Sequence, residues 1–392
     1  MLVGCTQGGS DLSDSGPIDD LQWADADAED VPSPDGDMPG DGDMPGDGDM
    51  PGDGDMPGDG GMPDDMPDPP GDADVLDSTM PPIDVLVDAP VLIDAGPTSQ
   101  PATGDGTKLS EQGVYGDFGT RYIPSDAITY TPRWELWTDG AVKRRWILLP
   151  PGAQIDNTDP EHWKFPVGAR LVKEFARDGA LVETRIIEIL ASGPSLRTYV
   201  WNTAQTEAVL TVDGAVDVAG TPHDVPTAHD CMKCHQSETG GGLGIQAVQL
   251  SPATITAWNT AGRFVVPIAN PTFGPTGSST EVAALGYLHA NCGHCHNPGG
   301  YAAVANNMTL RLDAAPKMAT SEPGYLTTVN VTVQGNGAGA GKRIAPMNPS
   351  NSAIIRRMSV RGNYDQMPLI GSEVVHTAGV STVTSWVNTI AP

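Results

Sequence analysis

Two short stretches of this 392-residue chain bring together residues that could do chemistry. They read Cys231-Met232-Lys233-Cys234-His235, here called motif 1, and Cys292-Gly293-His294-Cys295-His296, called motif 2. Both have the spacing C-x-x-C-H. Two thiols at this spacing can each form a thioether with the same porphyrin, and the histidine that follows can bind its iron. The two motifs therefore predict two covalently bound haem c groups.

The predicted cofactor-binding residues are the cysteines and the final histidine of each motif: Cys231, Cys234, His235, Cys292, Cys295 and His296. Four of the five cysteines of the chain are used in this way. Zinc ribbons usually separate their cysteine pairs by ~15–20 residues, far fewer than lie between these two motifs. A redox dithiol or a structural disulfide needs no histidine after the second cysteine. Haem attachment is therefore favoured over zinc and disulfides.

Residues 1–107 have the composition of a disordered tether. Residues 1–105 hold 27 of the 50 acidic residues and no lysine or arginine, so most of the formal net charge of −29 arises there. Residues 35–58 repeat Asp-Gly-Asp-Met-Pro-Gly four times. Proline and glycine in every repeat oppose helix and sheet, and the aspartates repel one another. The aspartates could bind calcium and the methionines copper, but a mobile strand offers no preformed cage.

The sequence Leu2-Val3-Gly4-Cys5 resembles the lipobox of bacterial lipoprotein signals, in which the cysteine is acylated. The resemblance implies a lipid anchor on Cys5 that attaches the chain to a membrane, such as the outer membrane. The protein would then lie in the cell envelope, facing the periplasm or on the cell surface, where haem c is also attached. Residues 106–392 carry nearly balanced charge and no basic patch, which predicts no nucleic-acid partner.

Residues 108–226 predict an antiparallel β domain, either a sandwich or a strongly bent sheet. Asp-Gly pairs, the strongest short hairpin signal, recur between apolar runs. Asp178-Gly179 separates two such runs, and Asp213-Gly214 separates Val209–Val212 from Ala215–Val218. The tryptophans of this region are expected mainly in its core.

Residues 227–277 form the first haem-attachment segment, and residues 278–392 predict a second, mainly helical domain. Ser278 and Glu281 fit a capping box at the start of a helix that carries motif 2 at its C-terminal end. A last helix follows from Gly379, with apolar residues at helical spacing. The fold class is therefore α+β multidomain: acidic tether, antiparallel β domain and helical haem domain.

Residues 278–392 resemble a class I cytochrome c domain, in which a first helix runs into C-x-x-C-H and a last helix crosses it. The resemblance implies a distal methionine ligand, and Met367-Pro368 matches that position. A long insert leaves Met347 and Met358 as rivals. It also implies close packing of the pair Gly286/Tyr287 against Trp386.

Residues 108–392 also look like the bacterial di-haem c-type cytochrome lipoproteins, which join a β-rich domain to such a cytochrome domain. The residues that carry this likeness are Trp134–Ala141, Trp163–Gly168 and the two motifs. The stretch Trp163–Phe175 is similar to cytochrome P460, a family that can oxidise small nitrogen compounds through a haem cross-linked to a lysine.

Two functions follow from these resemblances. The favoured one is electron transfer to and from redox partner proteins in the periplasm. The alternative is a haem enzyme, peroxidase-like or P460-like, in which the haem at motif 1 has an open sixth position and the haem at motif 2 relays electrons. The candidates for a distal ligand at motif 1 are His223, His229, Met308 and Met358.

Replacement of Met367 by alanine should abolish the absorption band that arises from charge transfer between a thioether and ferric iron. It should also lower one reduction potential, because a methionine ligand raises the potential of a haem. Met358→Ala is the control, since its setting in Ile354–Met358 is typical of a packing residue on a helix. The opposite behaviour of the two variants would show that the insert has moved the ligand.

Overall fold

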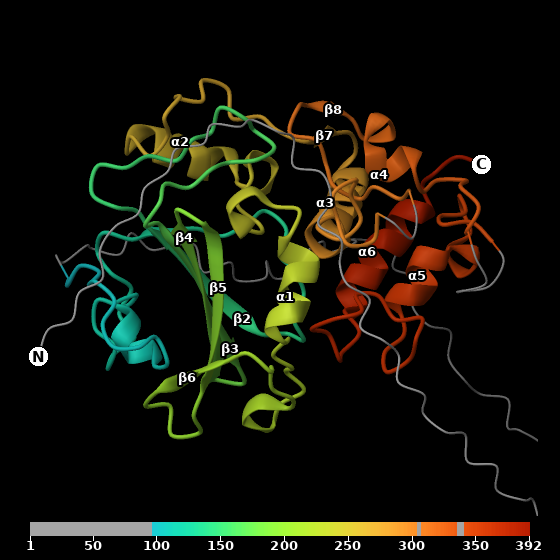
Figure 1. Cartoon of the computed structure of the whole chain (residues 1–392). Helices are drawn as coiled ribbons and strands as arrows, with labels where there is room; N and C mark the ends of the chain where they lie inside the picture. The colour runs from blue at the N-terminus through green and yellow to red at the C-terminus, as the bar shows by residue number, and fades with distance from the viewer. Residues whose placement is uncertain (1–95, 304–306, 335–340) are drawn as a thin grey trace, which may run out of the picture. The chain divides into compact units, whose positions relative to one another are not determined.

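The computed structural model describes residues 96–303, 307–334 and 341–392 (Figure 1). The predicted lipidation site at Cys5 and the aspartate-rich tether lie outside the described residues. Those that are described form one large antiparallel sheet and a group of helices. Among them, no helix has the length and apolar character needed to cross a membrane.

The sheet has six strands, and each strand pairs in antiparallel fashion with the next one along the chain. The strands are β1 (Ile128–Thr129), β2 (Val142–Leu148), β3 (Arg170–Arg177), β4 (Ala180–Leu190), β5 (Gly193–Trp201) and β6 (Ala208–Thr211). The predicted antiparallel β structure is confirmed, as a single sheet. A short parallel pair, β7 (Pro275–Thr276) with β8 (Lys317–Met318), lies apart from it.

The hairpin between β3 and β4 turns at Asp178-Gly179, as the sequence predicts. Both residues have positive φ, 50° and 82°, which suits the tight turn that matches the twist of the strands. The prediction of a strand at Ala215–Val218 is wrong. Ala215 forms only an isolated bridge to Val225, because the chain leaves the sheet after β6.

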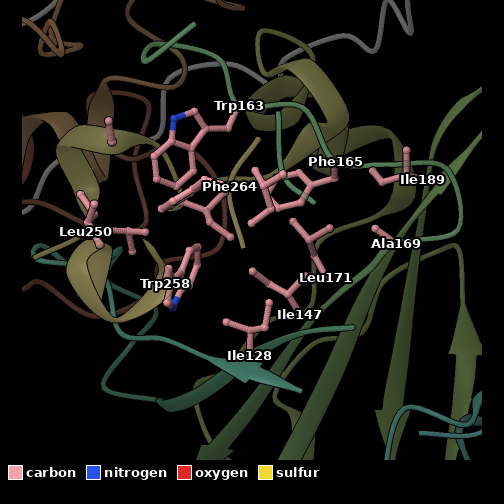
Figure 2. Packing of buried hydrophobic residues seen from close by; sticks show 14 of the residues in the cluster. Ile128, Ile147, Trp163, Phe165, Ala169, Leu171, Ile189, Leu250, Trp258 and Phe264 are labelled. Atoms are coloured by element: carbon pink, nitrogen blue, oxygen red, sulfur yellow. The ribbon is translucent and has the colours of Figure 1, made fainter. Parts of the chain in front are cut away.

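Both faces of the sheet are covered, and successive residues of a strand serve opposite faces. Trp146 of β2 packs in one buried cluster with Val172 and Tyr199. The next residue, Ile147, belongs to a second cluster with Trp163 and Phe165, which lie between β2 and β3, and with Trp258 and Phe264, which follow the sheet (Figure 2). Three of the five tryptophans of the β domain lie in these cores: Trp146, Trp163 and Trp201.

Residues 96–107, which the prediction assigned to the tether, belong to the β domain. The amide of Gln100 donates a hydrogen bond of 3.1 Å to the carbonyl of Gly113, and Ser99 Oγ donates one of 2.7 Å to Asp126. The folded part therefore begins by Gly96 rather than at Lys108, because these short polar residues find partners on the first loops of the domain.

The helices follow the sheet along the chain. They are α1 (Ala228–His235), α2 (Pro252–Thr260), α3 (Ser279–Cys292), α4 (Pro323–Leu326), α5 (Ala353–Met358) and α6 (Thr377–Val387). The 3₁₀ turns are η1 (Leu109–Gln112), η2 (Val218–Gly220), η3 (Thr239–Gly241), η4 (Ala247–Gln249), η5 (Ala319–Ser321) and η6 (Pro349–Asn351). In Figure 1, α1 lies alongside β5, and α3 lies with α6.

The α3 helix begins with the predicted capping box. Ser278 Oγ accepts from the amide of Glu281, and the Glu281 carboxylate accepts from the amide of Ser278 at 2.8 Å. The helix then packs against α6, as the resemblance implies, but with different partners. A Cβ on Gly379 would lie 2.3 Å from the ring of Tyr287, so the small residue is on the last helix. The predicted pairing of Gly286 with Trp386 is therefore wrong.

Residues 134–139, here called the docking loop, leave the β domain and lie against α3 and the segment before α6. The amide of Trp137 donates to Asn291 Oδ1 at 2.7 Å, and its indole N–H donates to the carbonyl of Val374 at 2.9 Å. The carboxylate of Asp139 accepts from the amide of Val374 at 2.7 Å. These buried polar groups are thus satisfied across the contact between the β domain and the helices.

The docking loop reaches α3 because Gly286 has no side chain. A Cβ at this position would lie 1.9 Å from the indole of Trp134, so no larger residue fits without displacing the ring. Trp137 adds a parallel stack on His376, with ring centroids 4.0 Å apart and planes 6° apart. Gly286 therefore packs against the docking loop, and the contact between α3 and α6 uses other residues.

Gly286→Val should lower the free energy of unfolding by about 2 kcal/mol, because it overpacks the contact with Trp134. Ala283→Val is the matched control, since Ala283 is exposed on the same helix. Denaturant unfolding measures both. In a Trp134→Ala background the cost of Gly286→Val should fall, and an unchanged cost would contradict the contact.

Candidate cofactor site

Motif 1 lies on α1, a helix with its N-terminus well capped. Thr227 Oγ1 accepts a hydrogen bond of 3.1 Å from the amide of Asp230, which satisfies one of the free amides of the first turn. Cys231 and His235 are four positions apart, so they lie on the same side of the helix. The helix ends at His235, and the chain then folds back over η3.

The imidazole of His235 is oriented as an iron ligand requires. Its Nδ1 donates a hydrogen bond to the carbonyl of Gly241 in η3, which leaves Nε2 as the free nitrogen. Burial lowers the pKa of His235 to about 3, so the ring is neutral near pH 7. A neutral, half-buried imidazole with one nitrogen held by a carbonyl fits the proximal ligand of a haem.

Motif 2 continues the helix α3 for one more turn. The amide of His296 donates to the carbonyl of Cys292 at 2.8 Å, which keeps these two residues on one side of the turn. Burial raises the pKa of the Cys292 thiol to about 12. The side chain of Cys292 packs against the helical core, and only 8% of His296 is exposed. The helix thus delivers motif 2 into a buried setting, as the sequence predicts.

The two motifs lie side by side. The sulfurs of Cys234 and Cys295 are 3.8 Å apart, and Cys295 Sγ lies 3.5 Å from the carbonyl of Lys233. The hydrogen bond between the thiols raises the pKa of Cys234 and lowers that of Cys295. Ser237 Oγ donates to the carbonyl of His294 at 3.1 Å. The second cysteine of each motif is therefore a neighbour of the other motif.

A buried ion pair joins the segments that follow the motifs. Arg311 binds the carboxylate of Glu238, and Gln246 Nε2 donates to the same carboxylate at 2.7 Å. The side chains of Glu238 and Arg311 are 5% and 12% exposed. A charged pair this far from water must keep both partners, because either one alone would be a buried, uncompensated charge.

A small hollow, with about 40 Å³ of space for water-sized molecules, opens between motif 1 and the sheet and is here called the motif-1 hollow. Cys231 and His235 line it from α1, and apolar residues of β3, β4 and β5 line it from the sheet: Leu171, Ile187 and Leu196. Its basic residues are Lys173, Arg185 and Arg197. The chemistry of this lining, apolar beside cationic, matches that of a porphyrin, which has carbon faces and two carboxylates.

A second small hollow, with about 30 Å³ of space for water-sized molecules, adjoins motif 2 and is here called the motif-2 hollow. His294 and His289 line it together with Trp134 of the docking loop. His289 Nδ1 accepts from the amide of Leu312 at 3.0 Å, so its proton is on Nε2. Lys173 lines both hollows, which are therefore adjacent.

The proposed distal methionine, Met367, lies half-buried in the loop before α6, where its amide donates to the carbonyl of Arg357 at 3.0 Å. Its rivals have other settings. Met358 is 4% exposed in the helical core, and Met347 is 61% exposed with a φ of 53°. Ligation by Met367 stays a prediction.

None of the four candidates for a distal ligand at motif 1 is among the described residues that line the motif-1 hollow. His223 is buried and its Nε2 lies 3.0 Å from the Glu183 carboxylate. His229 is exposed, while Met308 and Met358 pack with the helical core. Sequence position alone could not show this, because the partners of these residues come from distant strands and helices.

The cysteines also permit a different reading. Cys234, Cys295 and His294 present ligand atoms within 4.8 Å of one another, and thiolates with imidazole suit zinc. A structural zinc site usually has four ligands, and only these three are grouped among the described residues. The zinc interpretation also leaves the half-buried Cys231 and Cys292 without a role.

Sequence reasoning missed three parts of this site: the docking loop, the pair Glu238–Arg311 and Lys173. Glu238 stands three residues after motif 1, which is the one local signal of its role. Comparison of the chain with protein-family models, curated protein sequences and solved structures found no match. The assignment of the site therefore depends on the motifs and their geometry.

Arg311→Met should lower the free energy of unfolding by about 3–5 kcal/mol, because it leaves Glu238 buried without its cation. Lys317→Met removes the surface pair with Asp313 and should cost less than about 1 kcal/mol. Denaturant titration measures both changes. Adding Glu238→Gln to Arg311→Met should recover most of the loss, and no recovery would contradict the uncompensated charge as its cause.

Proposed function

We propose that this protein is a di-haem c-type cytochrome that transfers electrons in the bacterial cell envelope. The observation that supports it most directly is the 3.8 Å distance between the sulfurs of Cys234 and Cys295. Because these two sulfurs are in contact, a haem attached at motif 1 and a haem attached at motif 2 would be close neighbours. Haem iron supplies one-electron exchange between its ferric and ferrous states. Redox partners in the periplasm would bind the body, and a lipid on Cys5 would hold it at the membrane.

The residues of the chain would hold the two cofactors in fixed positions. The carbonyl of Gly241 orients His235, and the helical turn at the end of α3 orients His296. The pair Glu238–Arg311 ties the segments after the two motifs together. Rigid surroundings keep the structural change on electron uptake small, which favours rapid transfer.

The helical part, residues 278–392, would be a class I cytochrome c domain. Its support is the packing of α3 against α6 and the position of motif 2 at the end of α3. In this proposal Met367 completes the coordination at motif 2. A site with a histidine and a methionine leaves no open position, which suits electron transfer rather than substrate binding.

The protein produced with a haem-attachment system should carry two haems per chain. Replacing both cysteines of motif 1 by alanine should leave one, and the same change in motif 2 should also leave one. Intact mass and the pyridine haemochrome assay count the haems. Cys5→Ala is the control and should keep both. Two metal ions and no haem in the unmodified protein would reject the proposal.

A second candidate function is a haem enzyme with its reaction at motif 1. The observation that favours it is the motif-1 hollow, which none of the proposed distal ligands lines. An open sixth position there could accept a small molecule such as a peroxide or hydroxylamine. The adjacent motif 2 would then serve as the electron relay.

Electron paramagnetic resonance of the oxidised protein separates the two functions. Two low-spin ferric signals are expected for electron transfer alone. A high-spin ferric signal that changes when cyanide is added would favour the enzyme, because cyanide binds an open position. Removal of motif 1 by Cys231→Ala/Cys234→Ala should eliminate that signal, and removal of motif 2 should not.

A further inference from the structure

Three basic residues stand directly opposite one another on neighbouring strands of the sheet. Arg145 of β2 pairs in register with Lys173 of β3, and Lys173 pairs with Arg185 of β4. We call these the cationic row. Like charges placed opposite each other across a sheet repel and are destabilising. Negative charge nearby is therefore needed to offset the repulsion within the cationic row.

The charges of the row are only partly compensated within the chain. Arg185 forms two hydrogen bonds with the buried carboxylate of Glu183, at 2.8 and 2.6 Å. Arg145 lies 3.3 Å from the half-exposed carboxylate of Glu135. No carboxylate lies in hydrogen-bond reach of Lys173 among the described residues. Burial, together with Arg145 and Arg185, keeps the pKa of Lys173 well below its usual value.

The uncompensated charge faces a hollow that contains no acid. Lys173, Arg185 and Arg197 line the motif-1 hollow, and none of the described residues that line it is Asp or Glu. Glu183 occupies Nε and Nη2 of Arg185, so the hydrogens on Nη1 remain for another acceptor. Guanidinium and ammonium groups that line a hollow and have hydrogens free to donate bind carboxylate oxygens strongly.

The cationic row also has an apolar row beside it. Leu171 and Ile187 lie two residues along β3 and β4 from Lys173 and Arg185, on the same face of the sheet, and Leu196 of β5 stands opposite Ile187. One side of the hollow thus suits a flat carbon surface and the other suits carboxylates. Cys231 and His235 approach from α1 on the remaining side.

We propose that the cationic row is a carboxylate-binding site, and that Lys173 and Arg185 bind a propionate of the haem attached at motif 1. The inference deepens the proposed function and rests on it. The site would then hold the haem at the motif-1 hollow through its carboxylate and set the charge near the cofactor.

The test compares Lys173→Met with Lys143→Met in the haem-loaded protein. Lys143 lies on the same sheet, its Nζ donates to the carbonyl of Leu136 at 2.6 Å, and it does not line the motif-1 hollow. Methionine keeps the length of the side chain and removes a buried charge, so both variants should fold. Resonance Raman spectroscopy of the propionate-bending mode and redox titration are the readouts.

Lys173→Met should shift the propionate-bending band of one haem and lower its ferrous-to-ferric ratio at fixed potential about tenfold, because a nearby cation favours the reduced state. Lys143→Met should shift neither the band nor the ratio, and Lys173→Arg should restore the band.

Counting the haems distinguishes failure of the proposed function from failure of the propionate site. Absence of haem in the unmodified protein would refute the proposed function, whereas two haems with an unshifted band in Lys173→Met would refute the propionate site. An unshifted band together with a spectral response to added formate that Lys173→Met abolishes would assign the row to a free oxyanion instead, and would overturn the propionate assignment.

Discussion

The contact of Trp134 with Gly286 fixes where the β domain meets the helices. An indole can lie on α3 only at a residue without a side chain, since a Cβ would stand 1.9 Å from the ring. This contact places the docking loop beside Asn291, one residue before motif 2. The same loop borders the motif-2 hollow through Trp134. A packing constraint on one glycine thus helps to set the position of motif 2 relative to the sheet.

Charge is distributed in the structure according to depth. A buried charge needs a matched partner, and the pairs Glu183 with Arg185 and Glu238 with Arg311 follow this rule through hydrogen bonds. Lys173 departs from this rule, and it does so at the border of both hollows. A departure of this kind is costly and tends to occur where a ligand completes the site.

Several local features could be predicted from the sequence, whereas contacts between distant residues could not. The capping box at Ser278 and the turn at Asp178-Gly179 depend on residues within a few positions, so the sequence is sufficient to predict them. The partner of Gly286 comes from a loop about 150 positions away, and the resemblance to cytochrome c suggested the wrong aromatic residue. The cationic row requires knowledge of strand register, which periodicity alone does not supply.

The docking loop has a consequence for the order of folding. Its hydrogen bond from Trp137 to Val374 joins residues 237 positions apart, whereas the hairpins of the sheet and the helices close over short distances. Contacts of long sequence separation carry a large cost in chain entropy and form slowly. The sheet and the helical part should therefore take shape first and dock afterwards. The contact between motif 1 and motif 2 should then be among the last contacts of the native state to form.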